Sequence, residues 1–119
     1  MIDLVALLHA YHNALNAFDK RKVESMFAED IIYISPSMKS DGKGRAALML
    51  MFRKYFAEFS DQVSRDSKIE ILSPNVVKST WLLDATSGIT GLINQRRGEE
   101  TISFDDNGLI TKVEVKDQV

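Results

Sequence analysis

The 119-residue sequence has no cysteine, only two prolines and no long hydrophobic run. Without cysteine, disulfide frameworks, thiolate nucleophiles and metal sites with thiolate ligands are excluded. The longest apolar run, Ala46 to Phe52, is far too short to cross a bilayer. The N-terminus lacks a basic segment and carries Asp3 and His9 within its apolar stretch, which is untypical of a secretory signal. We therefore expect a cytoplasmic protein with no membrane partner.

The sequence also lacks a strong excess of either charge. Its 15 Lys and Arg residues are balanced by 17 Asp and Glu residues, and no stretch gathers the basic ones on one face. Binding to nucleic acid through phosphate neutralisation is therefore not expected. An apolar fraction of 45% over this length fits one folded domain that can enclose a core and a pocket. No linker or repeat divides the chain, so a single domain spanning residues 1–119 is predicted.

Two helices are predicted in the first 30 residues. Asp3 is a suitable N-cap, because its carboxylate can accept hydrogen bonds from the free amides of the first turn. Apolar residues then recur at steps of four and three and share one face: Leu4, Leu8, Tyr11, Leu15 and Phe18. Asp19 repeats the capping chemistry for a second helix, which is predicted to end at Glu29 and Asp30. Its buried side consists of Val23, Met26 and Phe27.

A strand, a loop and a third helix follow. Residues 31–35 are rich in β-branched and aromatic side chains and are predicted to form a strand that stops at Pro36. The polar segment 37–44 is predicted to be a loop. The third helix carries a broad apolar stripe, which must pack against a sheet: Leu48, Met51, Phe52, Tyr55, Phe56 and Phe59.

The second half of the chain supplies that sheet. Turn residues at 74–75 and 106–108 separate runs of β-forming residues, and Asn107-Gly108 predicts a hairpin between the last two. The polar stretch 88–98 is expected to interrupt the sheet. The predicted strands are 68–73, 76–86, 97–105 and 109–116. The order of elements indicates an α+β fold with helices on one face of a sheet.

Alternation predicts which side chains point into the core. In the strand 76–86 the inward set is Val77, Ser79, Trp81, Leu83 and Ala85. In the strand 97–105, Glu100 shares a face with Ile102 and Phe104. A carboxyl group is therefore expected on an apolar surface.

Four segments, in this order, resemble one fold family: 11–19 (YHNALNAFD), 27–36 (FAEDIIYISP), 42–52 (GKGRAALMLMF) and 104–113 (FDDNGLITKV). The chain resembles the nuclear-transport-factor-2-like superfamily, and within it the SnoaL-like and ketosteroid-isomerase-like branch. The resemblance covers nearly the whole chain. It implies a cystatin-like cone, in which three N-terminal helices pack on a strongly curved, mainly antiparallel sheet around an apolar pocket. It also implies a homodimer formed through the outer sheet face.

The resemblance carries a catalytic pattern. Ketosteroid isomerases use a carboxylate base, with a tyrosine and a neutral carboxylic acid that donate hydrogen bonds to the developing enolate oxygen. Matching the motifs places the tyrosine at Tyr11, the acid at Glu100 and the base at Ser35. A serine hydroxyl cannot take a carbon-bound proton unaided near neutral pH, so the family's steroid isomerisation is disfavoured. Tyr11 and Glu100 remain the catalytic candidates.

Other residues are assigned to the pocket or left between two interpretations. The pocket-lining candidates are Tyr33, Ser35, Met51, Tyr55, Trp81 and Phe104. Glu100 is either a pocket carboxyl or a rim carboxylate paired with Arg96 or Arg97, and Tyr11 is either a catalytic donor or a core residue. Arg96 and Arg97 either attract an anionic ligand at the pocket mouth or form a solvated charge pair.

No metal or cofactor is expected. His9 and His12 lie one helical turn apart, but no H-E-x-x-H pattern or second ligand cluster accompanies them. We expect surface or half-buried histidines, with His12 as a substitute base in the alternative. The segment 42–44 lacks the remainder of a phosphate-binding loop.

Two classes of function stay open. The first is a cofactor-independent isomerase, dehydratase or cyclase that acts on a small apolar or aromatic carbonyl compound. The second is a non-catalytic ligand-binding or dimerisation module that has lost the family base. Ser35 favours the second class, and Glu100 on an apolar face favours the first.

Overall fold

The computed structural model describes residues 3–35 and 38–117. Pro36 and Ser37, which include the predicted stop of the first strand, lie outside the described residues. Within these residues, three helices and six strands follow one another: α1 (Leu4–Asn16), α2 (Lys20–Met26), β1 (Phe27–Ser35), β2 (Met38–Lys43), α3 (Arg45–Glu58), β3 (Val63–Ser73), β4 (Val76–Thr86), β5 (Ile93–Phe104) and β6 (Ile110–Asp117).

Both predicted N-caps are confirmed. The carboxylate of Asp3 accepts a hydrogen bond from the amide of Ala6 at 3.1 Å, and that of Asp19 accepts one from the amide of Lys22 at 3.1 Å. Each bond satisfies an amide that has no partner inside its helix. The predicted end of the second helix is wrong. α2 ends at Met26 and β1 begins at once, because Phe27 already pairs with β6.

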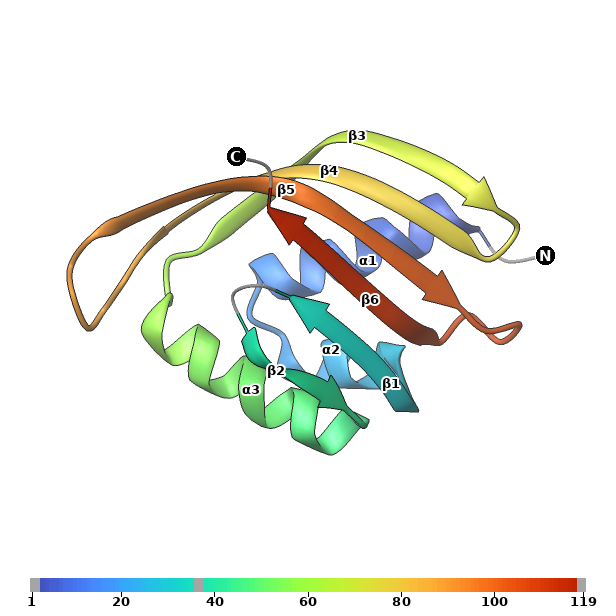
Figure 1. The fold of residues 1–119 in the computed structure, drawn as a ribbon, viewed down its shortest axis with the longest axis horizontal. Helices are drawn as coiled ribbons and strands as arrows, with labels where there is room; N and C mark the ends of the chain where they lie inside the picture. Colours follow the sequence, from blue (N-terminus) through green and yellow to red (C-terminus); the bar gives the residue numbers. More distant parts are fainter. Residues whose placement is uncertain (1–2, 36–37, 118–119) are drawn as a thin grey trace.

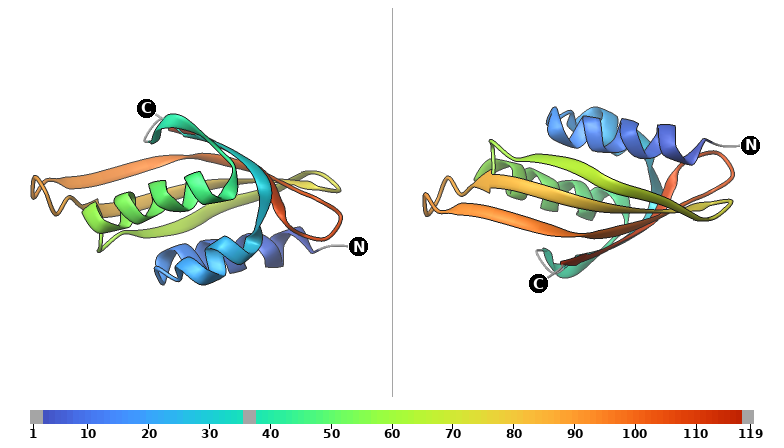
Figure 2. Two further views of the ribbon diagram at one scale, coloured as in Figure 1. Left: turned by 90° about the horizontal axis from the view of Figure 1, so that it is seen from below. Right: turned by 90° about the horizontal axis from the view of Figure 1, so that it is seen from above.

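The six strands form one sheet in the order β2-β1-β6-β5-β4-β3. β1 and β6 are parallel, and every other neighbouring pair is antiparallel. The sheet curls around the helices, which all lie on its inner side (Figure 1). From above, the strands β3, β4 and β5 lie in front of α3, and α1 lies alongside β3 (Figure 2). The α+β fold class expected from the sequence is thus confirmed.

Three segments that were not predicted as strands belong to the sheet. Residues 38–43 form β2 on β1, where Gly42 pairs with Tyr33. β3 begins at Val63 instead of residue 68, and β5 begins at Ile93 instead of residue 97. Both extensions pair with β4: Val63 lies opposite Asp84, and Ile93 lies opposite Thr86. Backbone pairing with a distant segment holds these polar residues in the sheet, and their own sequence has no strong strand pattern.

The core lies between the helices and the concave face of the sheet. All five residues predicted to point inward from β4 are buried, and the hairpin between β5 and β6 forms as predicted. On α3 the most deeply buried side chains are Leu48, Met49, Phe52 and Phe56. Phe52 stacks between Phe27 and Phe56, with ring centroids 6.0 and 5.6 Å apart. Burial of each such ring contributes about 1.5–3 kcal/mol. Of the helices in the described part of the chain, none is long and apolar enough to cross a membrane.

Candidate functional site

A cavity opens between α1, α3 and the inner face of the sheet. The space between its walls, together with the open mouth, is about 580 Å³. More than half of its lining side chains are apolar or aromatic, with a few polar groups among them, which is typical of a small-molecule site. Four of the six predicted lining residues lie on its wall: Tyr33, Ser35, Tyr55 and Trp81. Met51 is half-buried on α3 and Phe104 is buried in the core, and neither is part of the lining.

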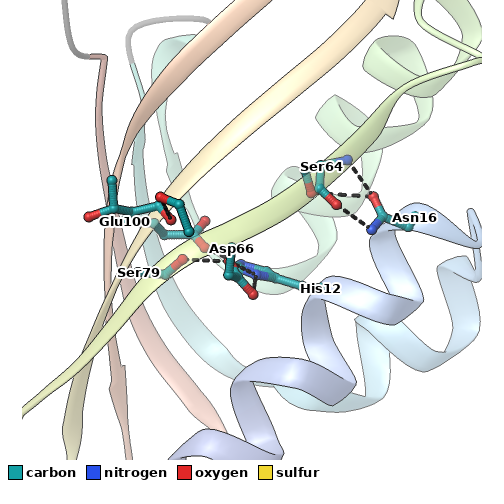
Figure 3. Close-up of polar contacts among 8 residues, drawn as sticks. His12, Asn16, Ser64, Asp66, Ser79 and Glu100 are labelled. Atoms are coloured by element: carbon teal, nitrogen blue, oxygen red, sulfur yellow. Dashed lines mark hydrogen bonds and ion pairs between the residues drawn. The ribbon is translucent and has the colours of Figure 1, made fainter.

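Glu100 lies on the cavity wall as one member of a buried polar cluster. His12 Nε2 lies 2.5 Å from Glu100 Oε1, and His12 Nδ1 lies 2.8 Å from Asp66 Oδ1 (Figure 3). The imidazole therefore links two carboxylates, one from β5 and one from β3. His12 and Glu100 are 8% and 5% exposed, so both groups depend on each other for hydrogen bonds.

A fourth residue fixes the position of Asp66. The Ser79 hydroxyl donates a hydrogen bond of 2.6 Å to Asp66 Oδ1. Ser79 is fully buried on β4 and is the direct cross-strand partner of Glu100 on β5. The alternation that placed Ser79 and Glu100 on the inner face thus brings them side by side beneath His12.

Polar pairing between α1 and β3 sets the position of His12. His12 and Asn16 are four residues apart on a helix, a rise of about 6 Å, and Ser64 and Asp66 are two apart on a strand, about 6.6 Å. The two spacings match, so each helical residue meets one strand residue. The Asn16 amide donates to the Ser64 carbonyl at 2.8 Å, and Asn16 Oδ1 accepts from the Ser64 amide at 2.9 Å. Because β3 is an edge strand, Asn16 replaces a missing strand neighbour there.

The two carboxylates hold a positive charge on His12. Burial alone would lower the pKa of the imidazole, but the charge of Glu100 and the hydrogen bonds to Asp66 and Glu100 raise it from 6.5 to about 10. For Asp66, burial opposes ionisation, yet the hydrogen bond and charge of His12 together with Ser79 lower its pKa. At neutral pH the cluster therefore contains an imidazolium, and Glu100 accepts its hydrogen bond as a carboxylate does.

The three tyrosines of the chain lie near this cluster. Tyr33 and Tyr55 line the cavity, and Tyr11 is fully buried next to Tyr33 and Glu100. The Tyr11 hydroxyl has no hydrogen-bond partner among the described residues. Burial, followed by Tyr33 and Glu100, raises the pKa of Tyr11, and burial followed by Glu100 raises that of Tyr33. Both hydroxyls therefore keep their protons and can act as donors.

Three residues of the cluster, His12, Asp66 and Ser79, were not among the predicted site residues, and Ser79 was expected only on the inner face of its strand. His12 was expected at a half-buried or surface position. It lies four residues after the buried Leu8, and this spacing places both side chains on the same face of α1. Asp66 was assigned to no strand, since β3 was predicted to begin at residue 68. His9 is exposed, and its charge is the smallest of the effects that lower the pKa of Asp66. Across residues 3–35 and 38–117, no three His, Cys, Asp or Glu side chains are arranged to hold a metal ion.

The fold and the pocket together define an α+β cone with an aromatic cavity and a polar cluster on its wall. Residues 8–113 match the SnoaL-like domain family, and the chain belongs to this family. No curated protein sequence matches the chain.

Solved structures of the same fold have low sequence identity to this chain. A Δ5-3-ketosteroid isomerase from Mycobacterium sp. has a TM-score of 0.82 at 20% identity, covering 94% of this chain and 90% of its own. A putative polyketide cyclase from Xanthomonas campestris has a TM-score of 0.83 at 20% identity, covering 93% and 87%. A Mycobacterium tuberculosis protein in complex with estradiol-17β-hemisuccinate has a TM-score of 0.82 at 18% identity, covering 93% and 90%.

Proposed function

We propose that this protein is a cofactor-independent enzyme of the isomerase, dehydratase or cyclase type, acting on a small apolar carbonyl compound. The observation that carries the proposal is the contact of Glu100 with a buried, charged His12 on the wall of an aromatic cavity. Buried carboxylates beside a charged partner and a cavity are typical of acid–base sites. Asp66 and Ser79 support the cluster from behind.

In this mechanism Glu100 takes a proton from the carbon next to the substrate carbonyl. His12 binds Oε1 of Glu100, which leaves the second carboxylate oxygen to act as the base. As the proton leaves, negative charge develops on the carbonyl oxygen. The hydroxyl of Tyr33, which lines the cavity and keeps its proton, donates a hydrogen bond to this oxygen. Return of the proton to another carbon gives isomerisation, and expulsion of a hydroxyl group gives dehydration.

This assignment differs from the pattern implied by the family resemblance. There, Glu100 corresponds to a neutral acid and Ser35 to the base. Here Ser35 lines the cavity without an acid–base group, and the charge of His12 keeps Glu100 in the role of an acceptor. We therefore assign the base to Glu100. The descriptions of the similar structures, a ketosteroid isomerase and a protein bound to an estradiol derivative, support an apolar ring compound as the ligand.

The second candidate function is a non-catalytic module that binds such a molecule. Two observations favour it: Ser35 stands at the family's base position, and His12 already occupies one oxygen of Glu100. Under this alternative the cluster stabilises the cone and shapes the cavity, and no proton is transferred to or from the ligand.

Deuterium exchange separates the two functions without knowledge of the natural substrate. Three planar ketones, 1-indanone, 2-tetralone and 4-chromanone, are incubated with protein in D2O, and loss of the proton next to the carbonyl is followed by NMR. The enzyme hypothesis predicts exchange faster than in buffer for at least one ketone, and a rate reduced by about a hundredfold in Glu100→Gln. Glu99→Gln is the matched control, because Glu99 lies on the opposite face of β5 and pairs with Lys78. Ketones that bind without faster exchange would overturn catalysis in favour of the binding module. Absence of binding by any ketone would contradict both.

We also propose that the protein is a cytoplasmic homodimer that associates through the outer face of the sheet. Ile32, Ile34 and Leu82 are 40%, 36% and 37% exposed on this face. Sedimentation equilibrium would show a dimer, which Leu82→Glu would weaken because it introduces a charge into the interface. A wild-type monomer at all concentrations would refute the proposal.

A further inference from the structure

A second charged group faces the cavity from the strand that carries Glu100. Arg96 of β5 is half-buried and contributes to the lining. The Cζ atom of its guanidinium lies 5.5 Å from the centroid of the Trp81 ring, within the range of a cation–π contact. The charge of Arg96 also acts on Tyr33, whose pKa it lowers against the larger effect of burial. The mechanism above does not use this arginine.

Arg96 and Glu100 stand at opposite ends of a flat apolar surface. Both belong to the inner face of β5, where Gly98 lies between them, so about 13 Å separates their α-carbons. Gly98 leaves room for Trp81, since a Cβ atom at this position would lie 2.9 Å from Cζ2 of the indole. The Trp81 ring thus covers the stretch between the positive and the negative residue.

The charges are distributed unevenly along this surface. At the Glu100 end, His12 compensates one of two carboxylates, so the cluster has a net negative charge. At the other end, Arg96 is the only charged side chain besides His12 and Glu100 among the described residues that line the cavity. The Arg96 end of the cavity is therefore positive and the Glu100 end negative. A ligand with matching polarity would carry its anionic group at the Arg96 end.

We propose that the ligand of this pocket is a flat apolar molecule that carries a carboxylate group, which Arg96 binds at its end of the cavity. This inference rests on the proposed ligand-binding role of the cavity and names the class of ligand. The planar guanidinium matches a carboxylate in two parallel hydrogen bonds, which a single ammonium group cannot form. The apolar body lies along Trp81, and the end opposite the carboxylate reaches Glu100. Arg96 is thus a specificity-determining residue, separate from the acid–base cluster.

The test compares three probes that share one ring system: 6-hydroxy-2-naphthoate, its uncharged amide 6-hydroxy-2-naphthamide, and 2-naphthol. Dissociation constants are measured by NMR titration or calorimetry. The charged probe is expected to bind wild-type protein about tenfold to a hundredfold more tightly than the amide, the range of one charge-assisted hydrogen-bonded pair. The preference should be lost in Arg96→Gln and partly kept in Arg96→Lys. Arg97→Gln is the matched control and should keep it, because Arg97 is exposed on the other side of the strand.

The outcomes distinguish this inference from the proposed function. Equal binding of all three probes to wild-type protein would overturn the Arg96 assignment and leave the cavity as a binding site for apolar molecules. An unchanged carboxylate preference in Arg96→Gln, or its loss in Arg97→Gln, would also overturn it. If no probe binds, the ligand-binding role of the cavity itself fails. The comparison of the three probes on wild-type protein does not depend on the folding of any variant.

Discussion

The charged state of His12 makes the stability of the protein depend on pH in a specific window. Its pKa is raised from 6.5 to about 10 in the folded protein, so the folded state holds a proton that the unfolded state releases between these values. The stabilisation is complete below pH 6.5 and is lost as the pH rises towards 10. At about 1.4 kcal/mol per pH unit, the free energy of unfolding should fall by about 5 kcal/mol across the window. Asp66 acts in the other direction, because its lowered pKa gives stability that is lost as the pH falls below 3.8.

Urea denaturation at half-unit steps from pH 6 to pH 10 measures this slope. Lysine and tyrosine groups also titrate at the upper end, so the informative quantity is the difference from His12→Gln, in which the slope due to this histidine is absent. His9→Gln is the matched control, because His9 is exposed on the same helix and forms none of the hydrogen bonds that hold the charge on His12, so the slope due to His12 should remain. The same slope in wild type and His12→Gln would refute the charged cluster.

Three further predictions concern the framework of the site. Gly98→Ala should destabilise the fold by about 1–3 kcal/mol in urea denaturation, because the added Cβ would lie 2.4 Å from a backbone oxygen of β6 and 2.9 Å from Trp81; an unchanged midpoint would contradict this packing. Ser79→Ala should raise the pKa of Asp66, followed by carboxyl NMR, and reduce stability by about 1–2 kcal/mol because a buried hydrogen bond is lost. Asp3→Ala should cost about 1 kcal/mol through loss of the α1 cap, and unaltered thermal stability would show that the cap contributes little.

Much of the fold could be predicted from local sequence signals. The N-caps of both early helices, the Asn107-Gly108 hairpin and the whole inward set of β4 depend on neighbouring residues or on strict alternation, and all are confirmed. The segments that were missed depend on distant partners. β2 is held by β1, and the first residues of β3 and β5 are held by β4. The side chains of these segments are mostly polar, so the alternation of apolar and polar residues that predicts a strand is absent.

The difference between local signals and distant partners also explains which residues of the candidate site could be predicted. Glu100 was found because it alternates with Ile102 and Phe104. The contact of His12 with Asp66 joins residues 54 positions apart, and it requires both the docking of α1 on β3 and the extension of β3 beyond its predicted start. A pattern read within one element cannot supply that pairing. The match between helix and strand spacing at Asn16 and Ser64 becomes visible only once the two elements are placed together.

The central claim is that Glu100 presents a free carboxylate oxygen to a ligand in the aromatic cavity while His12 binds the other oxygen. A crystal structure with 2-naphthol, whose hydroxyl group resembles an enol, tests it most directly. We predict the naphthol ring against Trp81, with its hydroxyl within about 3 Å of the Glu100 oxygen that His12 does not bind. Naphthol bound outside this cavity, or inside it with no contact to Glu100, would contradict the account.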